Sequence, residues 1–152
     1  MKPILALVLT AFLPCATIAA GASAEEATTA DTTGWIEPEY KGDLSDFLWH
    51  NRPVGVVAGS PGEPGFHDQW EGLAERAADL LDGDVVVLTD TDPSARSDLR
   101  KKLRPRGFML VLVGKDGGVK LRKPHPWTVR ELTRTIDKFP SRLREVEERR
   151  GS

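Results

Sequence analysis

Four polar residues of the sequence could meet around one loop rich in glycine and proline. The loop, residues 59–65, follows a short apolar run and precedes an amphipathic stretch, so we expect it to join a strand to a helix start. A helix start offers free N–H groups that favour an anion. Ser60 lies in the loop, His67 and Gln69 follow it, and Arg52 precedes the strand. They form a candidate binding site for an anion or a peptide; the alternative is an ordinary capped loop.

The other residues with catalytic or ligating side chains match no common motif. His50, His67 and His125 lack the spacing of metal-ligand motifs, so we expect no metal and no cofactor. Ser60 lacks the G-x-S-x-G elbow of serine hydrolases and has no assignable base. The run GKDGG, residues 114–118, lacks the Ser/Thr and the helix of a phosphate-binding loop, and it favours a hairpin turn.

Basic residues gather in the segment 96–106, which holds six of them in eleven positions. They are Arg96, Arg100, Lys101, Lys102, Arg104 and Arg106. Such a cluster could bind lipid headgroups or another anionic surface. Nucleic acid is not an expected partner, because no aromatic residues interleave for base stacking. The alternative is a solvated helix face opposite the apolar residues Ala95, Leu99 and Leu103.

Charge is divided unequally between two halves of the chain. Residues 25–95 contain 3 basic and 16 acidic residues, whereas residues 96–152 contain 17 basic and 7 acidic ones. Either the halves interleave in one fold and neutralise each other, or the basic half presents a face to polyanions. We favour the first interpretation. The four tryptophans are expected to pack in the core or at its edges; they are Trp35, Trp49, Trp70 and Trp127.

The first 24 residues have the pattern of a cleaved signal peptide. An uncharged apolar run, residues 4–20, precedes Ala22 and Ala24, which fit a small-x-small cleavage site. We expect an exported protein, periplasmic or secreted, without stable membrane insertion. The single cysteine, Cys15, lies within this segment, so a lipoprotein signal is the rival interpretation. Cleavage after Ala24 would leave no thiol, and thiol–disulfide oxidoreductase or peroxidase activity is not expected.

Apolar periodicity indicates the elements that position these residues. We expect strands at 53–58, 85–88, 108–113 and 119–122, and helices at 66–82, 93–103 and from Thr128 to Pro140. The order β-α-β-α-β-β-α predicts an α/β fold of three layers, α/β/α, around a central mixed sheet, which is a thioredoxin-like arrangement. The domain is expected to span 43–140, after a flexible linker at 25–42 and before a charged helical tail at 141–152.

Two sequence motifs resemble the exported domain-of-unknown-function family 4174. They are GKDGGVKLR at 114–122 and WHNRP at 49–53. Gln69 and a C-terminal set also match, the set being Ile136, Asp137, Pro140, Arg142 and Glu145. The resemblance implies a peroxiredoxin- or thioredoxin-like fold, with related domains in animal sushi-repeat and coiled-coil matrix proteins. Residues 139–141 are Phe-Pro-Ser where the family usually has Met-Pro-Met. The resemblance implies no activity.

In thioredoxin-like proteins, the catalytic cysteines lie between the first strand of the β-α-β unit and its helix. The corresponding loop here, residues 59–65, offers Ser60 and no thiol. We therefore predict a cysteine-free domain that binds an envelope or extracellular protein, or an anionic surface. The alternative is a thiol-independent enzyme that uses this loop with Arg52, His67 and Gln69. A third possibility is a structural accessory without a ligand cleft.

Overall fold

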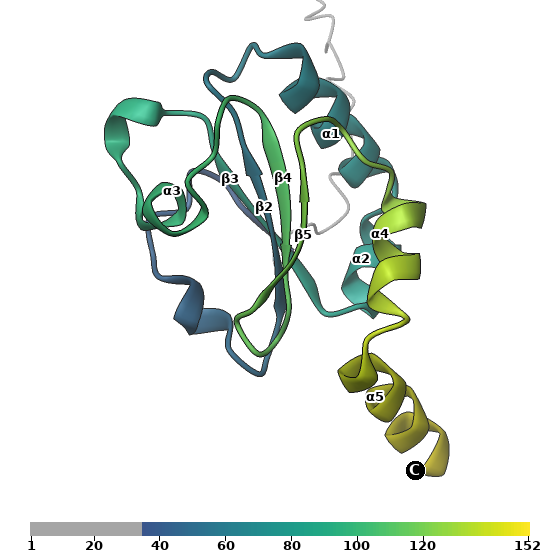
Figure 1. Ribbon diagram of the computed structural model, residues 1–152. Coiled ribbons are helices and arrows are strands. Elements are labelled where there is room, and N and C mark those ends of the chain that lie inside the picture. Colours follow the sequence, from purple (N-terminus) through teal and green to yellow (C-terminus); the bar gives the residue numbers. More distant parts are fainter. Residues whose placement is uncertain (1–34) are drawn as a thin grey trace, which may run out of the picture.

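The computed structural model describes residues 35–152, so the expected signal peptide and most of the expected linker lie outside the described residues. One mixed sheet, in the order β1-β3-β2-β4-β5, lies between two layers of helices (Figure 1). Its strands are β1 (Ile36–Glu37), β2 (Arg52–Val57), β3 (Val85–Asp90), β4 (Met109–Val113) and β5 (Val119–Lys123). The helices are α1 (Pro64–Glu75), α2 (Ala77–Asp82), α3 (Asp98–Leu103), α4 (Val129–Ile136) and α5 (Pro140–Gly151), with 3-10 turns η1 (Leu44–Phe47) and η2 (Pro93–Ala95).

The central strand is β2, whose six residues are all buried. It pairs in parallel with β3, with Val54 beside Val87, as the β-α-β pattern predicts. On its other side it pairs antiparallel with β4, which continues into β5 through the expected hairpin. Gly117 has the positive φ, 77°, that the tight turn requires. The uninterrupted apolar runs are therefore the buried middle of the sheet.

The far end of the segment expected to be a linker belongs to the fold. Ile36 pairs with Val87 and adds β1 as a short parallel edge strand. Trp35 is buried in the core, and the Tyr40 N–H donates to the Thr89 carbonyl at 3.0 Å. This strand could not be predicted from the sequence, because two residues are too few to show the alternation of apolar and polar residues that indicates a strand.

Each face of the sheet has its own hydrophobic cluster. One face packs under α1, α2 and α4, where Leu73, Leu80 and Leu132 are buried. The other packs under α3 and η1, where Leu99 and Leu103 are buried. A capping box starts α4, with Thr128 and Glu131 each accepting a hydrogen bond from the other's backbone N–H.

Two expected helices are broken. The helix expected at 66–82 is interrupted at Arg76, which has φ −126° and ψ 36°, so that α2 turns Leu80 into the core. The helix expected at 93–103 is interrupted at Arg96, which is left-handed. Ser97 then caps α3, because its hydroxyl accepts from the Arg100 N–H and donates to the buried Asp90 carboxylate. Ala95, expected to face inward, is exposed.

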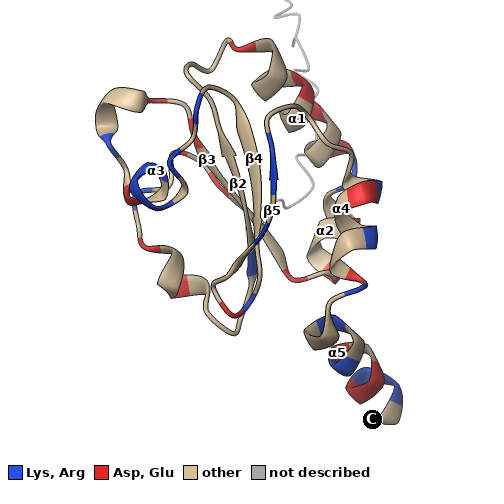
Figure 2. Cartoon of the chain, viewed as in Figure 1, with Lys and Arg blue, Asp and Glu red and all other residues tan. Residues whose placement is uncertain are grey.

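Basic and acidic residues are interspersed over the described elements (Figure 2). Ion pairs join the acidic first half of the chain to the basic second half, including Arg100–Asp90 at 2.8 Å and Lys115–Asp84 at 2.8 Å. This arrangement supports the interpretation that the halves neutralise each other in one fold. In the part of the chain that the structure describes, no helix is long and apolar enough to cross a membrane.

Candidate functional site

The four residues of the expected loop site do not converge. Arg52 begins β2, whereas Ser60 lies in the loop after its end. At a rise of about 3.3 Å per residue, the two ends of β2 are about 17 Å apart. Ser60 and His67 are exposed, and the His67 Nε2 lies 3.1 Å from the Glu71 carboxylate. The loop itself is closed by Glu63, which accepts from the Gly59 N–H at 2.7 Å.

Gln69 is buried and holds the segment before α4. Its Nε2 donates to the Trp127 carbonyl at 2.9 Å, and its Oε1 accepts from the Trp127 N–H at 2.7 Å. Both polar atoms of the amide are thereby used within the fold. Gln69 therefore has a structural role, that of holding the backbone at Trp127, and its side chain is not available to a ligand.

Replacing Gln69 by Leu is expected to lower the free energy of unfolding by roughly 1–3 kcal/mol, because the Trp127 N–H and carbonyl lose their partner. Urea denaturation checks this. His67→Leu, at an exposed position two residues away, is the control and should change stability by less than about 0.5 kcal/mol. Equal effects of the two substitutions would contradict the assigned role.

The six basic residues at 96–106 do not form one face. The Arg100 side chain is largely buried, with Nε donating to Asp90 at 2.8 Å. Lys101 pairs with Asp98, and Lys102 pairs with Asp43. Arg96, Arg104 and Arg106 are exposed and have no carboxylate partner among the described residues.

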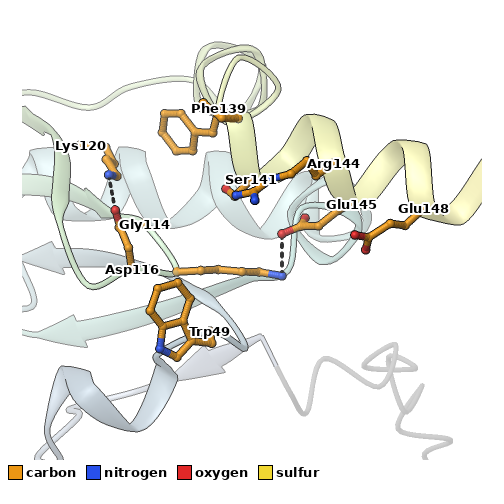
Figure 3. Close-up of a pocket in the computed structure, with 11 residues that line it drawn as sticks. Trp49, Gly114, Asp116, Lys120, Phe139, Ser141, Arg144, Glu145 and Glu148 are labelled. Atoms are coloured by element: carbon orange, nitrogen blue, oxygen red, sulfur yellow. Dashed lines mark hydrogen bonds and ion pairs between the residues drawn. The ribbon is translucent and has the colours of Figure 1, made fainter.

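A different site forms at the opposite end of the sheet, where the segments that carry the family resemblance meet. The 49–53 run, the 114–118 turn and the start of α5 surround a groove of about 560 Å³ (Figure 3). Its lining includes Trp49, Lys115, Lys120, Phe139, Arg144 and Glu148. In Figure 3, Trp49 and Phe139 lie on opposite sides of the groove. Arg52 was expected at the loop site, but it lies at this end of β2 beneath the groove, and the sequence did not predict the groove.

Trp49 is the most unusual residue of the groove. Its side chain is 72% exposed, contrary to the expectation that the tryptophans pack in the core or at its edges. Its backbone is left-handed, with φ 65°, a conformation that costs roughly 1–2 kcal/mol for a residue with a side chain. The Trp49 N–H donates to the Lys115 carbonyl at 2.8 Å, which holds this conformation. The Trp49 ring is therefore largely exposed to solvent, so its burial does not offset the energy of the left-handed backbone.

A cluster of charged side chains beneath the groove attaches α5 to the sheet. Arg52 is fully buried; its Nη1 donates to the Gly83 carbonyl at 2.9 Å, and its Nη2 donates to Glu145 at 2.9 Å and to the Ser141 hydroxyl at 3.2 Å. Lys115 lies 3.0 Å from Glu145 and 2.8 Å from Asp84. One carboxylate, that of Glu145, thus binds two cations from distant parts of the chain.

A second contact holds the same helix. Arg142 is buried, its Nη1 donates to the Asp82 carbonyl at 2.8 Å, and its Nη2 pairs with the Asp82 carboxylate. Partial burial raises the pKa of Asp82, but the hydrogen bonds and charges of Arg142 and Arg149 outweigh this and lower it. Partial burial likewise raises the pKa of Glu145, and the hydrogen bonds from Arg52 and Lys115 outweigh it, so that this pKa is also lowered.

The attachment of α5 is expected to weaken in acid. Because the folded pKa of Glu145 lies below its ordinary value of 4.5, its stabilising effect is present above that pH and is lost as pH falls through the lowered pKa. Amide NMR shifts of residues 140–151, followed from about pH 7 to about pH 3, should move toward coil values before those of β2 do. Glu145→Gln should reduce this pH dependence and leave the part that Asp82 contributes through Arg142, because the pKa of Asp82 is also lowered. A titration unchanged in that variant would contradict the assignment to Glu145.

The groove suits binding better than catalysis. Its charged lining is balanced: Lys115, Lys120 and Arg144 face Asp116, Glu145 and Glu148. Two of the cations are already paired, Lys115 as described and Lys120 with Asp116 at 2.7 Å. The Ser141 hydroxyl accepts from Arg52, and no histidine lines the groove. Among residues 35–152, no group of His, Cys, Asp and Glu could hold a metal ion.

A smaller groove of about 230 Å³ lies beside the expected loop site. Pro61, Phe66, His67 and Trp70 line it, and the rings of Phe66 and Trp70 are stacked with centroids 6.3 Å apart. His67 is the only member of the expected four that it contains.

Comparisons with known proteins agree with the expected family and fold class. A family model described as a domain of unknown function (DUF4174) matches residues 43–145. A solved structure of chloroplastic thioredoxin z, described as defining a type-specific target recognition, is 20% identical and has a TM-score of 0.50. That match covers 68% of this chain and 92% of the other, and it confirms the thioredoxin-like fold. No curated protein matches the chain.

Proposed function

This chain belongs to the DUF4174 family, and we propose that it is a binding protein that holds a segment of a partner protein in the groove between the β4–β5 turn and α5. Trp49 carries this proposal, since it is 72% exposed, held in a left-handed backbone, and placed across the groove from Phe139 (Figure 3). Strained, exposed aromatic residues are typical of functional sites rather than of packing.

The lining of the groove favours a protein segment over an anionic surface. A polyanion requires unbalanced positive charge, and here three cations face three carboxylates. The apolar walls contributed by Trp49, Phe139 and Pro140 suit an apolar side chain of the partner. The volume of the groove, about 560 Å³, is within the usual size of binding clefts.

The proposed place of action is outside the cytoplasm. The signal-peptide pattern of residues 1–24 supports export, so we propose an envelope or extracellular protein as the partner. Thiol chemistry is not part of the proposed function, because the single cysteine of the sequence lies within that segment. An enzyme built around loop 59–65 has less support, since Arg52 and Gln69 are both occupied by contacts within the fold.

The test is capture of partners from an envelope extract by the purified chain and by matched variants. Trp49→Ala should reduce the captured amount of a specific partner at least about tenfold, because buried aromatic anchors dominate interface energies. Leu81→Ala is the control, since Leu81 is also an exposed apolar residue but lies outside the groove.

A third variant tests the anionic surface. Arg104→Glu combined with Arg106→Glu reverses exposed charges of the 96–106 segment and should leave capture unchanged. Loss of capture in that variant, or capture indifferent to Trp49→Ala, would contradict the proposal.

A further inference from the structure

Helix α5 is joined to the domain by polar contacts rather than by the core. It contributes no side chain to either of the hydrophobic clusters formed by the described residues. Leu143, an apolar residue of α5, is 54% exposed. Figure 1 shows α5 extending beyond the three-layer body, with its beginning near the sheet. An element held in this way is a candidate for local opening, because few apolar contacts oppose its release.

The polar contacts that hold α5 lie mainly in its first half. Glu145 binds Arg52 and Lys115, Arg142 binds Asp82, and the Ser141 hydroxyl accepts from Arg52. Farther along, the structure gives only the exposed pair of Arg149 with Asp82, at 3.3 Å. The same first half forms one wall of the groove. Detaching these contacts would therefore remove that wall.

A hinge precedes the helix. The backbone N–H groups of Asp137, Lys138 and Phe139 all donate back to carbonyls of α4, at 2.8, 3.3 and 2.9 Å. Phe139 is extended, with ψ 134°, and Pro140 cannot donate a hydrogen bond from its backbone. The Leu143 N–H, which donates to the Phe139 carbonyl, begins the bonds of α5 itself. Rotation at Phe139 therefore breaks few backbone bonds and leaves α4 packed on the sheet.

We propose that α5 is a hinged wall that swings out as one unit about Phe139 while the sheet stays folded, and thereby opens and closes the groove. The inference rests on the proposed function, which places the partner between this wall and Trp49. A segment that touches both walls binds the closed state alone and shifts the population toward it. The fraction of chains with α5 docked then sets the apparent affinity of the groove.

Hydrogen exchange of the full chain, read by mass spectrometry, tests the hinge. Glu145→Gln removes one charge from the contact with Arg52 and Lys115. The amides of α5 should then exchange roughly 10- to 100-fold faster. This factor corresponds to the free energy that a hydrogen bond to a charged group contributes. In the wild-type chain and in the variant, the amides of α5 should exchange together and faster than those of β2 and β4, because α5 opens without unfolding of the sheet. Glu147→Gln is the control, because Glu147 is exposed on the same helix and lies outside the groove.

Two results would overturn the inference. One is exchange of α5 at the same rate as the central strands, in the wild type and in Glu145→Gln, which would show that α5 opens only when the whole fold unfolds. The other is exchange graded from Ser152 inward, with Ser141 to Glu145 protected, which would show ordinary fraying of a chain end. The test needs no partner, so its failure leaves the Trp49 capture experiment standing, and failure of that experiment leaves the hinge standing.

Discussion

Replacing Asp90 by Ala is expected to lower the free energy of unfolding by roughly 3–5 kcal/mol, the usual cost of leaving a buried charge without its partner. Asp90 ends β3 and is 2% exposed. It accepts hydrogen bonds from the Arg100 Nε at 2.8 Å, from the Ser97 hydroxyl and from the Asp92 N–H at 3.1 Å. Its loss leaves the Arg100 guanidinium largely buried beside the Ala58 carbonyl and releases the residue that caps α3. Urea denaturation monitored by circular dichroism measures the change.

Two further variants separate this effect from a general loss of charge. Asp98→Ala breaks an exposed pair with Lys101 and should cost less than about 1 kcal/mol. Asp90→Ala combined with Arg100→Met removes both buried charges and should recover part of the loss, because no uncompensated ion remains. If Asp90→Ala were no more destabilising than Asp98→Ala, the buried contact would not be what holds α3 at the end of β3.

The middle of the sheet could be predicted because its signals are local. An uninterrupted apolar run such as 108–113 fits only a strand buried on both faces, and Asp116-Gly117 is a turn that needs a positive φ. The start of α4 was equally clear, since Thr128 and Glu131 have the spacing of a capping box. These are properties of neighbouring residues, and the fold preserves them.

The candidate site could not be predicted, because it depends on pairs that are distant in the sequence. Arg52 and Glu145 are 93 positions apart, and no periodicity connects them. The one signal was that the family-like motifs combine basic residues, Arg52 and Lys115, with an acidic residue, Glu145, in separate segments. The helix break at Arg96 was hidden for a related reason, since the buried Asp90 carboxylate, which accepts from Ser97 and Arg100, overrides helix propensity.

Trp49 is the residue whose position is least explained by packing, because a tryptophan is expected in the core and this one is 72% exposed. If its left-handed backbone is strained, Trp49→Gly should be more stable than Trp49→Ala by about 1 kcal/mol, since glycine adopts positive φ without a steric penalty. Both variants should lose capture of the partner, since neither retains the ring. The comparison holds the loss of the ring constant, and glycine is the more stable variant only if the relief of backbone strain exceeds its greater unfolded-state entropy.

Urea denaturation and the capture assay, run on the same preparations, check both halves of the prediction. Ser60→Gly beside Ser60→Ala is the matched control, because Ser60 is exposed and is not among the non-glycine residues with positive φ. There glycine should be the less stable of the two, by roughly 0.5–1 kcal/mol if the loop backbone is ordered. If glycine at position 49 were less stable by as much as at position 60, the strain would not exist. If Trp49→Gly kept the partner, the ring would not be the anchor, and the groove would be a by-product of how α5 docks.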